Sequence, residues 1–583
     1  MNILPLSAGD GLSKPSFHPV PLKHDYSIPG LYAFHAEHSP DHPVFAYADF
    51  ENGITHNITY VEAWRDIRKV AATVSARCSL ATAATGTQKR QIISILALSD
   101  TLSYVYLTLA IMSLGHIAFP LSPRNSPVVT AHLLEKVGVD YIFVSEDPDM
   151  QALAKEANEL LVAKGLQAVN IVAMTSIMNL DPEDTTAGLE TGIKDIADTD
   201  VAIILHSSGT TAYPKPIPLT RRGLINLANI PQFGEMDLTG KRIAAHTNPV
   251  FHAMGLATIL WPITSGATFV LYKPVSPPAP PTPANFLESW TAAKCNIVFC
   301  IPVFLESWAR DAKNISLLKA LDCVIFSGAS VNKYIGDALA QEGVVMHPFW
   351  GSTEVGPATM YIPKEAPPTH EWEYFKISKH IKFRMQSQEN MDGIYEPIMI
   401  PTETCFPPVF NSELDGQPVY AVGDLLERHP TDPERWKVYG RKDDQIMLST
   451  AENVNPLPIE ATLLQDKNIA AALLFGRGHY EIGVLINPSN GVSIPENDEV
   501  KRAEYIASIW PVIEKANTVA PKYANIQRKR IVLTSSSKPL EYTPKGTPRR
   551  AVCLSLYAAE IEEVYQDERD ALLANDRQFP DRV

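Results

Sequence analysis

Residues 201–220 read VAIILHSSGTTAYPKPIPLT, in which an apolar run leads directly into a loop of serine, threonine and glycine that ends in a lysine. The apolar run predicts a buried strand. A loop at the end of a strand can offer backbone N–H groups, hydroxyls and one cation to a polyphosphate. The expected phosphate-binding residues are Ser207, Ser208, Gly209, Thr210, Thr211 and Lys215. A solvated polar turn would have the same composition, so other segments must decide between the two.

Apolar runs like this one recur on both sides of the loop. Five of them are QIISILAL, VDYIFVS, ATFVLY, CNIVFCIP and LDCVIFSG, and helix-length amphipathic segments separate them. This alternation predicts an α/β fold with mainly parallel sheets flanked by helices. A chain of 583 residues exceeds one core, so we expect a large N-terminal domain of several lobes over residues 1–440.

The pattern changes after Gly440. Short runs typical of hairpin strands, AAALLFG and YEIGVLINP, precede a helical segment at about residues 498–516. Residues 441–583 are therefore predicted to form a small α+β domain. The long apolar region of residues 92–121 is interrupted by Asp100, Gly115 and His116, which favours a buried strand and helix over a membrane span.

Composition excludes several classes of partner. The formal net charge is -15 and no basic patch interrupts it, so neither nucleic acid nor an anionic membrane is expected to bind. The six cysteines lack CxxC spacing, and the N-terminus lacks the basic start and apolar stretch of a secretory signal. We expect a cytoplasmic protein.

The loop SSGTTAYPK resembles the phosphate loop of the adenylate-forming superfamily, which includes acyl- and aryl-CoA ligases, luciferases and peptide synthetase adenylation domains. Further segments resemble that family in the same order along the chain. They are HPFWGSTEVGP, VYAVGDLLERH, YGRKDDQIMLSTAENVNPLPIE and EYTPKGTPRR. Two positions depart from the usual loop, since Ala212 and Pro216 stand where glycine is common.

The resemblance assigns a role to each motif residue. It implies that Trp350 lies against adenine, that Thr353 contacts the α-phosphate and that Glu354 holds Mg²⁺, which is a hard cation with oxygen ligands. Asp424 would bind the ribose hydroxyls, Arg441 would lie near ribose and phosphate, Asp443 would be the hinge between domains, and Lys545 would be the mobile catalytic lysine. Gly351, Ser352, Gly328, Ala329 and Ser330 complete the expected nucleotide site.

Each motif has an ordinary alternative when it is considered alone. GSTE could begin a helix with a hydroxyl cap, and the Gly-Asp pair at Asp424 could be a simple turn. The implied reaction joins a carboxylic acid to AMP and releases pyrophosphate, with Lys545, Glu354 and Lys215 reducing the charge repulsion at phosphorus.

The segment NPVFHAMGLATIL corresponds to the stretch that lines the acid pocket in the family. It lacks the aspartate that pairs with the ammonium of an amino acid, which disfavours an α-amino acid and favours an aryl or other acid. The expected pocket residues are His252, Met254, Val303 and Phe304. His252 could also be an ordinary core histidine.

FPLSPRN, MLSTAENVNPLPIE and YTPKGTPRR look most like fungal adenylate-forming reductases, which are peptide-synthetase-like enzymes. That likeness implies transfer to phosphopantetheine on a carrier domain, followed by an NADPH-dependent reductase domain. No carrier or dinucleotide motif follows Lys545, so we expect this sequence to perform activation and thiol transfer only. A free-standing acyl- or aryl-CoA ligase and an inactive nucleotide-binding scaffold remain the alternatives.

Two further patterns are rejected as sites. His35, His38 and His42 suggest zinc by their spacing, but they fall in a polar helix-to-loop region where the family binds no metal. GEMDLTGKR has the wrong glycine spacing for a P-loop and lacks its hydroxyl.

Overall fold

The computed structural model describes residues 16–21, 25–78, 90–180, 197–206, 214–331, 333–388, 391–448, 453–489, 494, 498–521, 523–543 and 546–566. The described residues form two compact units. The larger unit draws on Met1–Arg384, Ile398–Val422 and His429–Lys437, and the smaller on Met385–Pro397, Gly423–Arg428 and Val438–Val583.

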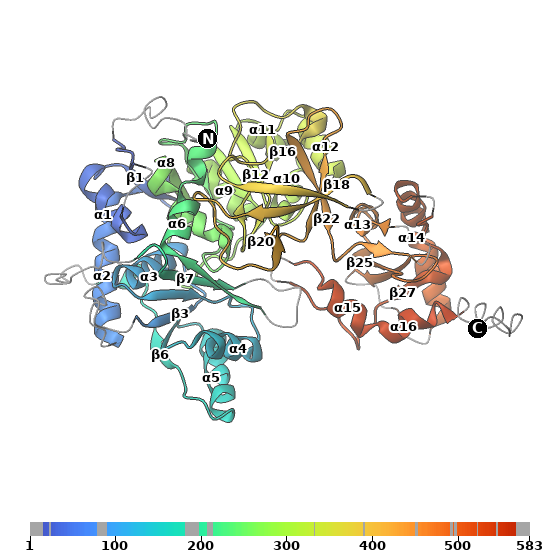
Figure 1. Ribbon diagram of the computed structural model, residues 1–583, viewed down its shortest axis with the longest axis horizontal. Helices are drawn as coiled ribbons and strands as arrows, with labels where there is room; N and C mark the ends of the chain where they lie inside the picture. The colour runs from blue at the N-terminus through green and yellow to red at the C-terminus, as the bar shows by residue number, and fades with distance from the viewer. Residues whose placement is uncertain are drawn as a thin grey trace, which may run out of the picture. The chain divides into compact units, whose positions relative to one another are not determined.

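A six-stranded sheet contains the apolar run VAIIL and the strand that follows the polar loop (Figure 1). Its strand order is β6-β5-β3-β4-β7-β8, and only the β7–β8 pair is antiparallel. The strands are β3 (Ile92–Leu96), β4 (Ile117–Pro120), β5 (Tyr141–Val144), β6 (Asn170–Ala173), β7 (Val201–His206) and β8 (Pro216–Thr220). Helices α3 (Thr101–Ser113), α4 (Pro127–Val137) and α5 (Pro148–Ala163) connect the parallel strands, as strand-helix-strand units require.

A seven-stranded sheet of the same unit has the order β13-β12-β11-β9-β10-β1-β2, and all its pairs are parallel except β1–β2. Its strands are β1 (Pro43–Asp49), β2 (Ile54–Thr59), β9 (Arg242–Ala244), β10 (Thr268–Leu271), β11 (Ile297–Cys300), β12 (Cys323–Phe326) and β13 (Met346–Pro348). Helices α9 (Pro283–Ala292), α10 (Pro302–Trp308), α11 (Ala312–Lys319) and α12 (Lys333–Gln341) alternate with its strands.

One continuous core joins the two parallel sheets. It contains Ile93 and Ile95 of the first sheet together with Ile243, Phe269 and Phe299 of the second. The helices that contribute to it are α1 (Ile28–His38), α2 (Tyr60–Cys78), α3, α6 (Arg221–Ala228), α7 (Leu256–Leu260) and α8 (Pro262–Ser265). The parallel sheets and flanking helices confirm the predicted α/β class.

The apolar region of residues 92–121 forms β3, α3 and β4, as a buried strand followed by a helix. Helix α3 is buried from Leu102 to Ser113, so it is apolar on every side because protein surrounds it. None of the described helices combines the length and hydropathy that crossing a bilayer requires.

Short antiparallel strands follow the second parallel sheet. β14 (Gly351–Ser352) pairs with β15 (Gly356–Pro357). A further sheet has the order β16-β22-β21-β18-β20-β19, with β17 paired to β18. Its strands are β16 (Phe375–Lys376), β17 (Lys382–Gln388), β18 (Met391–Ile400), β19 (Ser412–Leu414), β20 (Gln417–Ala421), β21 (Asp424–Arg428) and β22 (Arg435–Arg441).

The smaller unit contains a three-stranded sheet of β25 (Ile469–Phe475), β26 (Gly483–Pro488) and β27 (Ile531–Leu533). β25 and β26 form the predicted hairpin, and α14 (Glu499–Val519) is the predicted long helix with Asp498 as its N-cap. Its other elements are β23 (Ile446–Met447), β24 (Asn453–Val454), α13 (Pro456–Leu463), α15 (Arg550–Leu556) and α16 (Ala558–Glu563). One core packs α13 and α14 against the sheet, and a second contains Cys553, Tyr557 and Tyr565.

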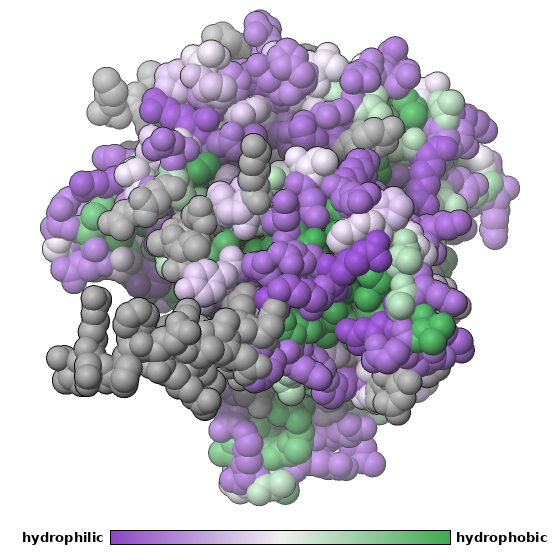
Figure 2. Space-filling model, turned by 90° about the vertical axis from the view of Figure 1, so that its right-hand side faces the viewer, coloured by the Kyte–Doolittle hydropathy of each residue, from purple (hydrophilic) through white to green (hydrophobic). Residues whose placement is uncertain are grey.

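The surface is mainly hydrophilic on the face drawn in Figure 2, and hydrophobic residues gather at its lower end, at the height of α5 in Figure 1. Val162, Leu166 and Ile171 are exposed on α5, on the loop after it and on β6. Exposed apolar side chains are common on protein surfaces, so this group by itself assigns no function.

Two of the three histidines that suggested zinc, His35 and His42, have structural roles. His35 Nε2 lies 2.7 Å from the carbonyl of Ile263, and His42 Nε2 lies 2.8 Å from that of Gly266. Both rings are buried, and Phe17 stacks on His35. They connect α1 and β1 to the segment after α7 by hydrogen bonds.

Candidate active site

Strand β7 ends at His206 and β8 begins at Pro216, and these two residues are paired in the antiparallel ladder. The expected phosphate loop therefore starts and ends on neighbouring strands. Ser207, Ser208, Gly209, Thr210 and Thr211 lie outside the described residues, whereas Lys215 is described and exposed. The role of all six in phosphate binding stays a prediction.

His206 fixes the end of β7 and was not among the sequence-predicted residues. Its side chain is buried, and its Nε2 accepts a hydrogen bond from Ser122 N at 3.1 Å. Ser122 belongs to the segment FPLSPRN, which the sequence analysis names only for its likeness to fungal adenylate-forming reductases. A histidine next to the polar loop was the only signal for this contact.

Four parallel strands of the second sheet end at one edge. Ser327 N donates to Cys300 O at 3.2 Å, and Phe349 N donates to Phe326 O at 2.8 Å, so the segments after β11, β12 and β13 run side by side. β9 pairs with β11, which brings the segment after Ala244 to the same edge. Ligands of open parallel sheets bind at the carboxyl ends of their strands.

Gly328, Ala329 and Ser330 follow β12 at this edge and are exposed. Gly328 has a φ of +90°, a left-handed conformation that favours glycine. Ser327 Oγ donates to Phe349 O at 2.7 Å and fixes this turn beside the next motif. The structure thus brings two predicted nucleotide segments together.

GSTEVG forms a tight hairpin of β14 and β15, with Thr353 and Glu354 at its turn. The alternative interpretation, in which GSTE begins a helix, is wrong because Gly351 and Ser352 pair with Pro357 and Gly356. A Cβ on Gly351 would lie 2.2 Å from Gly356 O, so glycine is required there. Thr353 and Glu354 are half-buried.

The Glu354 turn offers oxygen donors suited to magnesium. It carries one carboxylate and the hydroxyls of Ser352 and Thr353, and Mg²⁺ prefers hard oxygen ligands with phosphate completing its shell. The residue types present therefore fit the ion that the sequence predicts. Trp350, immediately before the hairpin, is 8% exposed and stacks on Phe375 with ring centroids 5.8 Å apart.

The expected acid-pocket residues occupy different surroundings. His252 and Met254 are half-buried in the segment after β9, and Gly255 is needed there because a Cβ would lie 2.0 Å from Pro249 O. Val303 is 57% exposed, whereas Phe304 is 7% exposed and packs edge-on against Phe286 at 5.5 Å. Two neighbouring residues of α10 therefore differ in exposure. The ring of Phe304 belongs to the hydrophobic core that also contains Phe286 and Trp308.

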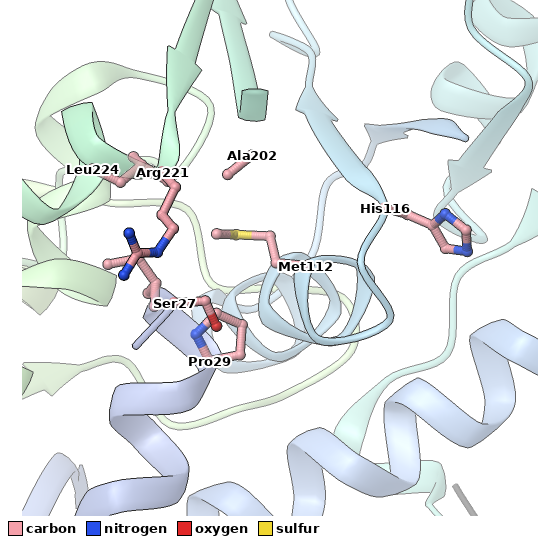
Figure 3. A pocket seen from close by; sticks show the side chains of 8 residues that line it. Ser27, Pro29, Met112, His116, Ala202, Arg221 and Leu224 are labelled. Carbon is pink, nitrogen blue, oxygen red and sulfur yellow. The ribbon is translucent and has the colours of Figure 1, made fainter. Parts of the chain in front are cut away.

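A small cavity of the same unit lies among α1, α3 and α6 (Figure 3). Met112 and Arg221 point into the same space there, while the ring of His116 points away. The cavity has a volume of about 10 Å³, which holds about one water molecule. It is too small for a carboxylic acid substrate.

In the smaller unit, three predicted residues form two adjoining ion pairs. Arg441 Nη1 lies 3.1 Å from Asp424 Oδ1, and Arg441 Nε lies 3.1 Å from Asp443 Oδ1. Burial acts to lower the pKa of Arg441, and the charges of Asp424 and Asp443 outweigh it, so that the pKa is raised. The guanidinium therefore remains a cation between the two carboxylates.

A second group of ion pairs includes Asp444, the residue after Asp443, and sequence reasoning missed it. Arg550 binds Glu460 through two contacts of 2.7 and 2.5 Å, and its Nε lies 3.4 Å from Asp444 Oδ1. Burial raises the pKa of Asp444, and the Arg550 charge opposes that rise. Residues separated by about a hundred positions make this group, so no local pattern could reveal it.

Lys545 lies outside the described residues, but the chain around it is described. Thr543 N donates to Thr547 O at 2.7 Å, and Gly546 N donates to Thr543 O at 2.9 Å. Tyr542 and Pro548 form an antiparallel bridge just outside them. These contacts bring the described residues on either side of Lys545 close together, and the catalytic role of Lys545 stays a prediction.

Family models match most of the chain. The model described as AMP-binding enzyme matches residues 32–379, and the model described as AMP-binding enzyme C-terminal domain matches residues 443–569. The chain belongs to the AMP-binding enzyme family. This AMP-binding enzyme is thus an adenylate-forming enzyme.

Named relatives agree with the more specific resemblance. The AMP-binding enzyme is 33% identical over 545 residues to the adenylate-forming reductase Nps10 of Heterobasidion annosum, covering 92% of this chain and 49% of that protein. It is 29% identical over 574 residues to the reductase Nps11 of Serpula lacrymans, covering 95% and 51%. The chain spans about half the length of these curated relatives.

A solved structure shows the same fold. It is the o-succinylbenzoate coenzyme A synthetase MenE of Bacillus subtilis in complex with ATP and magnesium ion, with a TM-score of 0.66 at 16% identity. The likeness covers 90% of this chain and 98% of that one.

Proposed function

We propose that this AMP-binding enzyme uses ATP to convert an aryl or other non-amino carboxylic acid into its acyl adenylate, with release of pyrophosphate. The acyl group then passes to the phosphopantetheine thiol of a carrier domain. The observation that carries the proposal is the shared strand edge, where the segments of residues 245–254, 327–330 and 349–354 follow β9, β12 and β13.

The residues divide the work between two domains, which we place at residues 1–440 and 441–583. In the first, the loop of residues 207–215 binds the leaving pyrophosphate, Trp350 lies against adenine and Thr353 contacts the α-phosphate. Glu354 holds Mg²⁺, which supplies positive charge to phosphate oxygens when bound. Asp424 of the first domain and Arg441 at the start of the second hold the ribose, since a carboxylate can accept from both hydroxyls of a vicinal diol.

Lys545 completes the proposed mechanism from the second domain. Its ammonium bridges the substrate carboxylate and the α-phosphate, so that two anions can approach in line. No general base is needed, because a carboxylic acid is already ionised at neutral pH. Rotation at Asp443 then withdraws the lysine and admits the thiol.

The preference for a non-amino acid rests on the segment after β9. It carries Phe251, His252, Ala253 and Met254, and no carboxylate that could pair with a substrate ammonium. Phe251 and His252 lie 4.9 Å apart by ring centroid, which gives the segment an aromatic surface. We place His252 and Met254 in the acid pocket with Val303 beside them, and we leave out Phe304 because its ring packs against Phe286.

The named reductases support a carrier as the acceptor, followed by reduction to an aldehyde by an NADPH-dependent domain in a longer enzyme. A cytoplasmic location is part of this proposal. An acyl- or aryl-CoA ligase is the second candidate, because the matched solved structure is named a coenzyme A synthetase.

The test is acid-dependent exchange of pyrophosphate into ATP with benzoic, phenylpropanoid, fatty, keto and amino acids. Exchange with an aryl or other non-amino acid is expected, and exchange only with amino acids would refute the acid class. Exchange with none of them would favour the inactive scaffold. The preformed adenylate is then offered to coenzyme A and to a phosphopantetheinylated carrier, and faster transfer to coenzyme A would identify a ligase.

A further inference from the structure

The turn after β22 is held differently before and after Asp443. Before it, Lys442 N donates to Gly423 O at 2.8 Å, and Lys442 Nζ lies 2.5 Å from Glu396 Oε2. Arg441 is bound to Asp424 at 3.1 Å. The chain up to Lys442 is therefore attached to β18 and to the start of β21.

After Asp443, the turn is attached to other elements of the smaller unit. Arg477, in the loop after β25, donates through Nη2 to Asp443 O at 3.1 Å and to Gln445 O at 2.6 Å. Asp444 is bound by Arg550 at the start of α15. Asp443 is thus the residue at which the attachment changes from one set of elements to the other.

Two side-chain amides form hydrogen bonds that connect residues after Asp443 to the backbone before it. Gln445 Nε2 donates back to Arg441 O at 3.1 Å, and Asn455 Nδ2 donates to Tyr439 O at 2.7 Å. Gln445 is 6% exposed, and among the described residues its buried Oε1 has no hydrogen-bond partner. An acceptor buried in this way is unfavourable, so the present conformer does not satisfy Gln445 fully.

We propose that Gln445 and Asn455 are positioning residues that form a latch across Asp443. The latch holds the present hinge conformer, and it must open when the torsions of Asp443 turn. This proposal rests on the proposed function, in which one hinge conformer serves adenylation and another serves thiol transfer. Weakening the latch should therefore change the rate of adenylation relative to the rate of thiol transfer.

Asn455 allows the latch role to be separated from a purely structural role. Its Oδ1 accepts from Leu457 N at 3.2 Å as the N-cap of α13, while its Nδ2 makes the latch bond. Asn455→Asp keeps a capping acceptor and removes the donor. Gln445→Met removes the other latch bond with little change in side-chain shape.

Asn517 offers a matched control in the same unit. Its Nδ2 donates to Ile526 O at 3.1 Å and its Oδ1 accepts from Ile526 N at 2.7 Å, so Asn517→Asp loses the same kind of bond away from the hinge turn. Neither of its contacts involves residues 439–445.

The experiment measures two rates for the full chain with the best acid of the exchange screen. One is single-turnover pyrophosphate release, and the other is transfer from the preformed adenylate to the phosphopantetheinylated carrier. One neutral hydrogen bond changes a conformational equilibrium by about fivefold. We expect Asn455→Asp and Gln445→Met to change the ratio of the two rates about fivefold in the same direction.

Asn517→Asp should leave that ratio within about twofold of the wild type. A ratio that stays within about twofold in both latch variants, or that moves in opposite directions, would overturn the latch. An inactive wild type would refute the proposed function instead. If the wild type is inactive, hydrogen exchange of residues 439–448 tests the latch by itself. A latch requires faster exchange in Asn455→Asp than in Asn517→Asp, and equal exchange would overturn it.

Discussion

The strand edge of the larger unit and the turn around Asp443 in the smaller unit are held by different kinds of contact. At the edge, the candidate site consists of backbone turns whose glycines are fixed by contacts, such as Gly351 against Gly356 O at 2.2 Å. At the turn, Arg441 pairs with the carboxylates of Asp424 and Asp443, and Arg477 donates to the backbone carbonyl of Asp443. Close packing resists rearrangement, whereas exposed ion pairs are weak and exchange easily.

The difference suggests a division of labour. A preorganised edge can hold a nucleotide without reorganising during the reaction, which is what electrostatic catalysis needs. A turn held by hydrogen bonds and ion pairs can have two conformers of similar free energy, which is what a moving domain needs. Four predictions test this contrast, from the largest expected effect to the smallest.

Replacing Lys545 should have the largest effect on adenylation. Lys545→Ala removes the ammonium proposed to stabilise charge at the α-phosphate, and pyrophosphate release should fall roughly a hundredfold or more. The matched control is Lys501→Ala, because Lys501 is an exposed residue of α14 that pairs only weakly with Asp498 at 3.6 Å. A fall of less than about tenfold in Lys545→Ala would contradict its role.

Glu354→Gln should weaken the use of magnesium. The amide keeps the size of the side chain but loses the charge that holds a divalent ion, so the Mg²⁺ concentration for half-maximal pyrophosphate release should rise roughly 10- to 100-fold. Glu373→Gln is a control for losing a carboxylate of the same unit outside the hairpin. An unchanged Mg²⁺ requirement in Glu354→Gln would show that another group holds the ion.

Acid should destabilise the larger unit through its buried histidines. Burial lowers the pKa of His246 from its ordinary value near 6.5 to about 3, and a hydrogen bond to the Leu271 backbone opposes part of that change. As the pH falls, His246 is protonated in the unfolded chain near pH 6.5 and in the folded protein only near pH 3. The stability that depends on neutral His246 is therefore complete above pH 6.5 and is lost progressively as the pH falls toward 3.

The corresponding variant is His246→Gln, which cannot titrate. Between pH 7 and pH 5 the wild type should lose roughly 2 kcal/mol more of its free energy of unfolding than the variant. Urea titrations at the two pH values measure this difference. Equal losses in both proteins would mean that His246 is already accessible to protons in the folded state.

Asp444→Asn should have the smallest effect. Asp444 lies 3.4 Å from Arg550 and is partly exposed, so its loss should lower the free energy of unfolding by only about 0.5–1 kcal/mol. Thermal unfolding of the two proteins provides the comparison. A loss above about 3 kcal/mol would show that the turn is as rigid as the strand edge, and the contrast would then fail.

Much of the fold could be predicted because local patterns decide it. Apolar runs such as VAIIL and LDCVIF became strands β7 and β12, and the segment after Asp498 became α14. Hydrophobic periodicity reports which side of an element is buried, and loop chemistry reports where the element ends.

What could not be predicted depends on contacts between distant residues. The choice between hairpin and helix at GSTE depends on pairing with Gly356 and Pro357. The burial of Phe304 beside exposed Val303 depends on Phe286 of α9. The Asp444–Arg550–Glu460 group depends on a helix that starts about a hundred residues after the turn. Spacing within one segment contains no information on such partners.

The thiols of this chain affect how an acyl adenylate can react. Burial raises the pKa of Cys78 to about 11 and those of Cys300 and Cys405 to about 12, and none of the six cysteines forms a disulfide. Since the thiolate is the nucleophile, these sulfurs react slowly at neutral pH. An acyl adenylate bound at the proposed site would therefore acylate these buried cysteines slowly, and a single cysteine engineered on the surface would be labelled selectively.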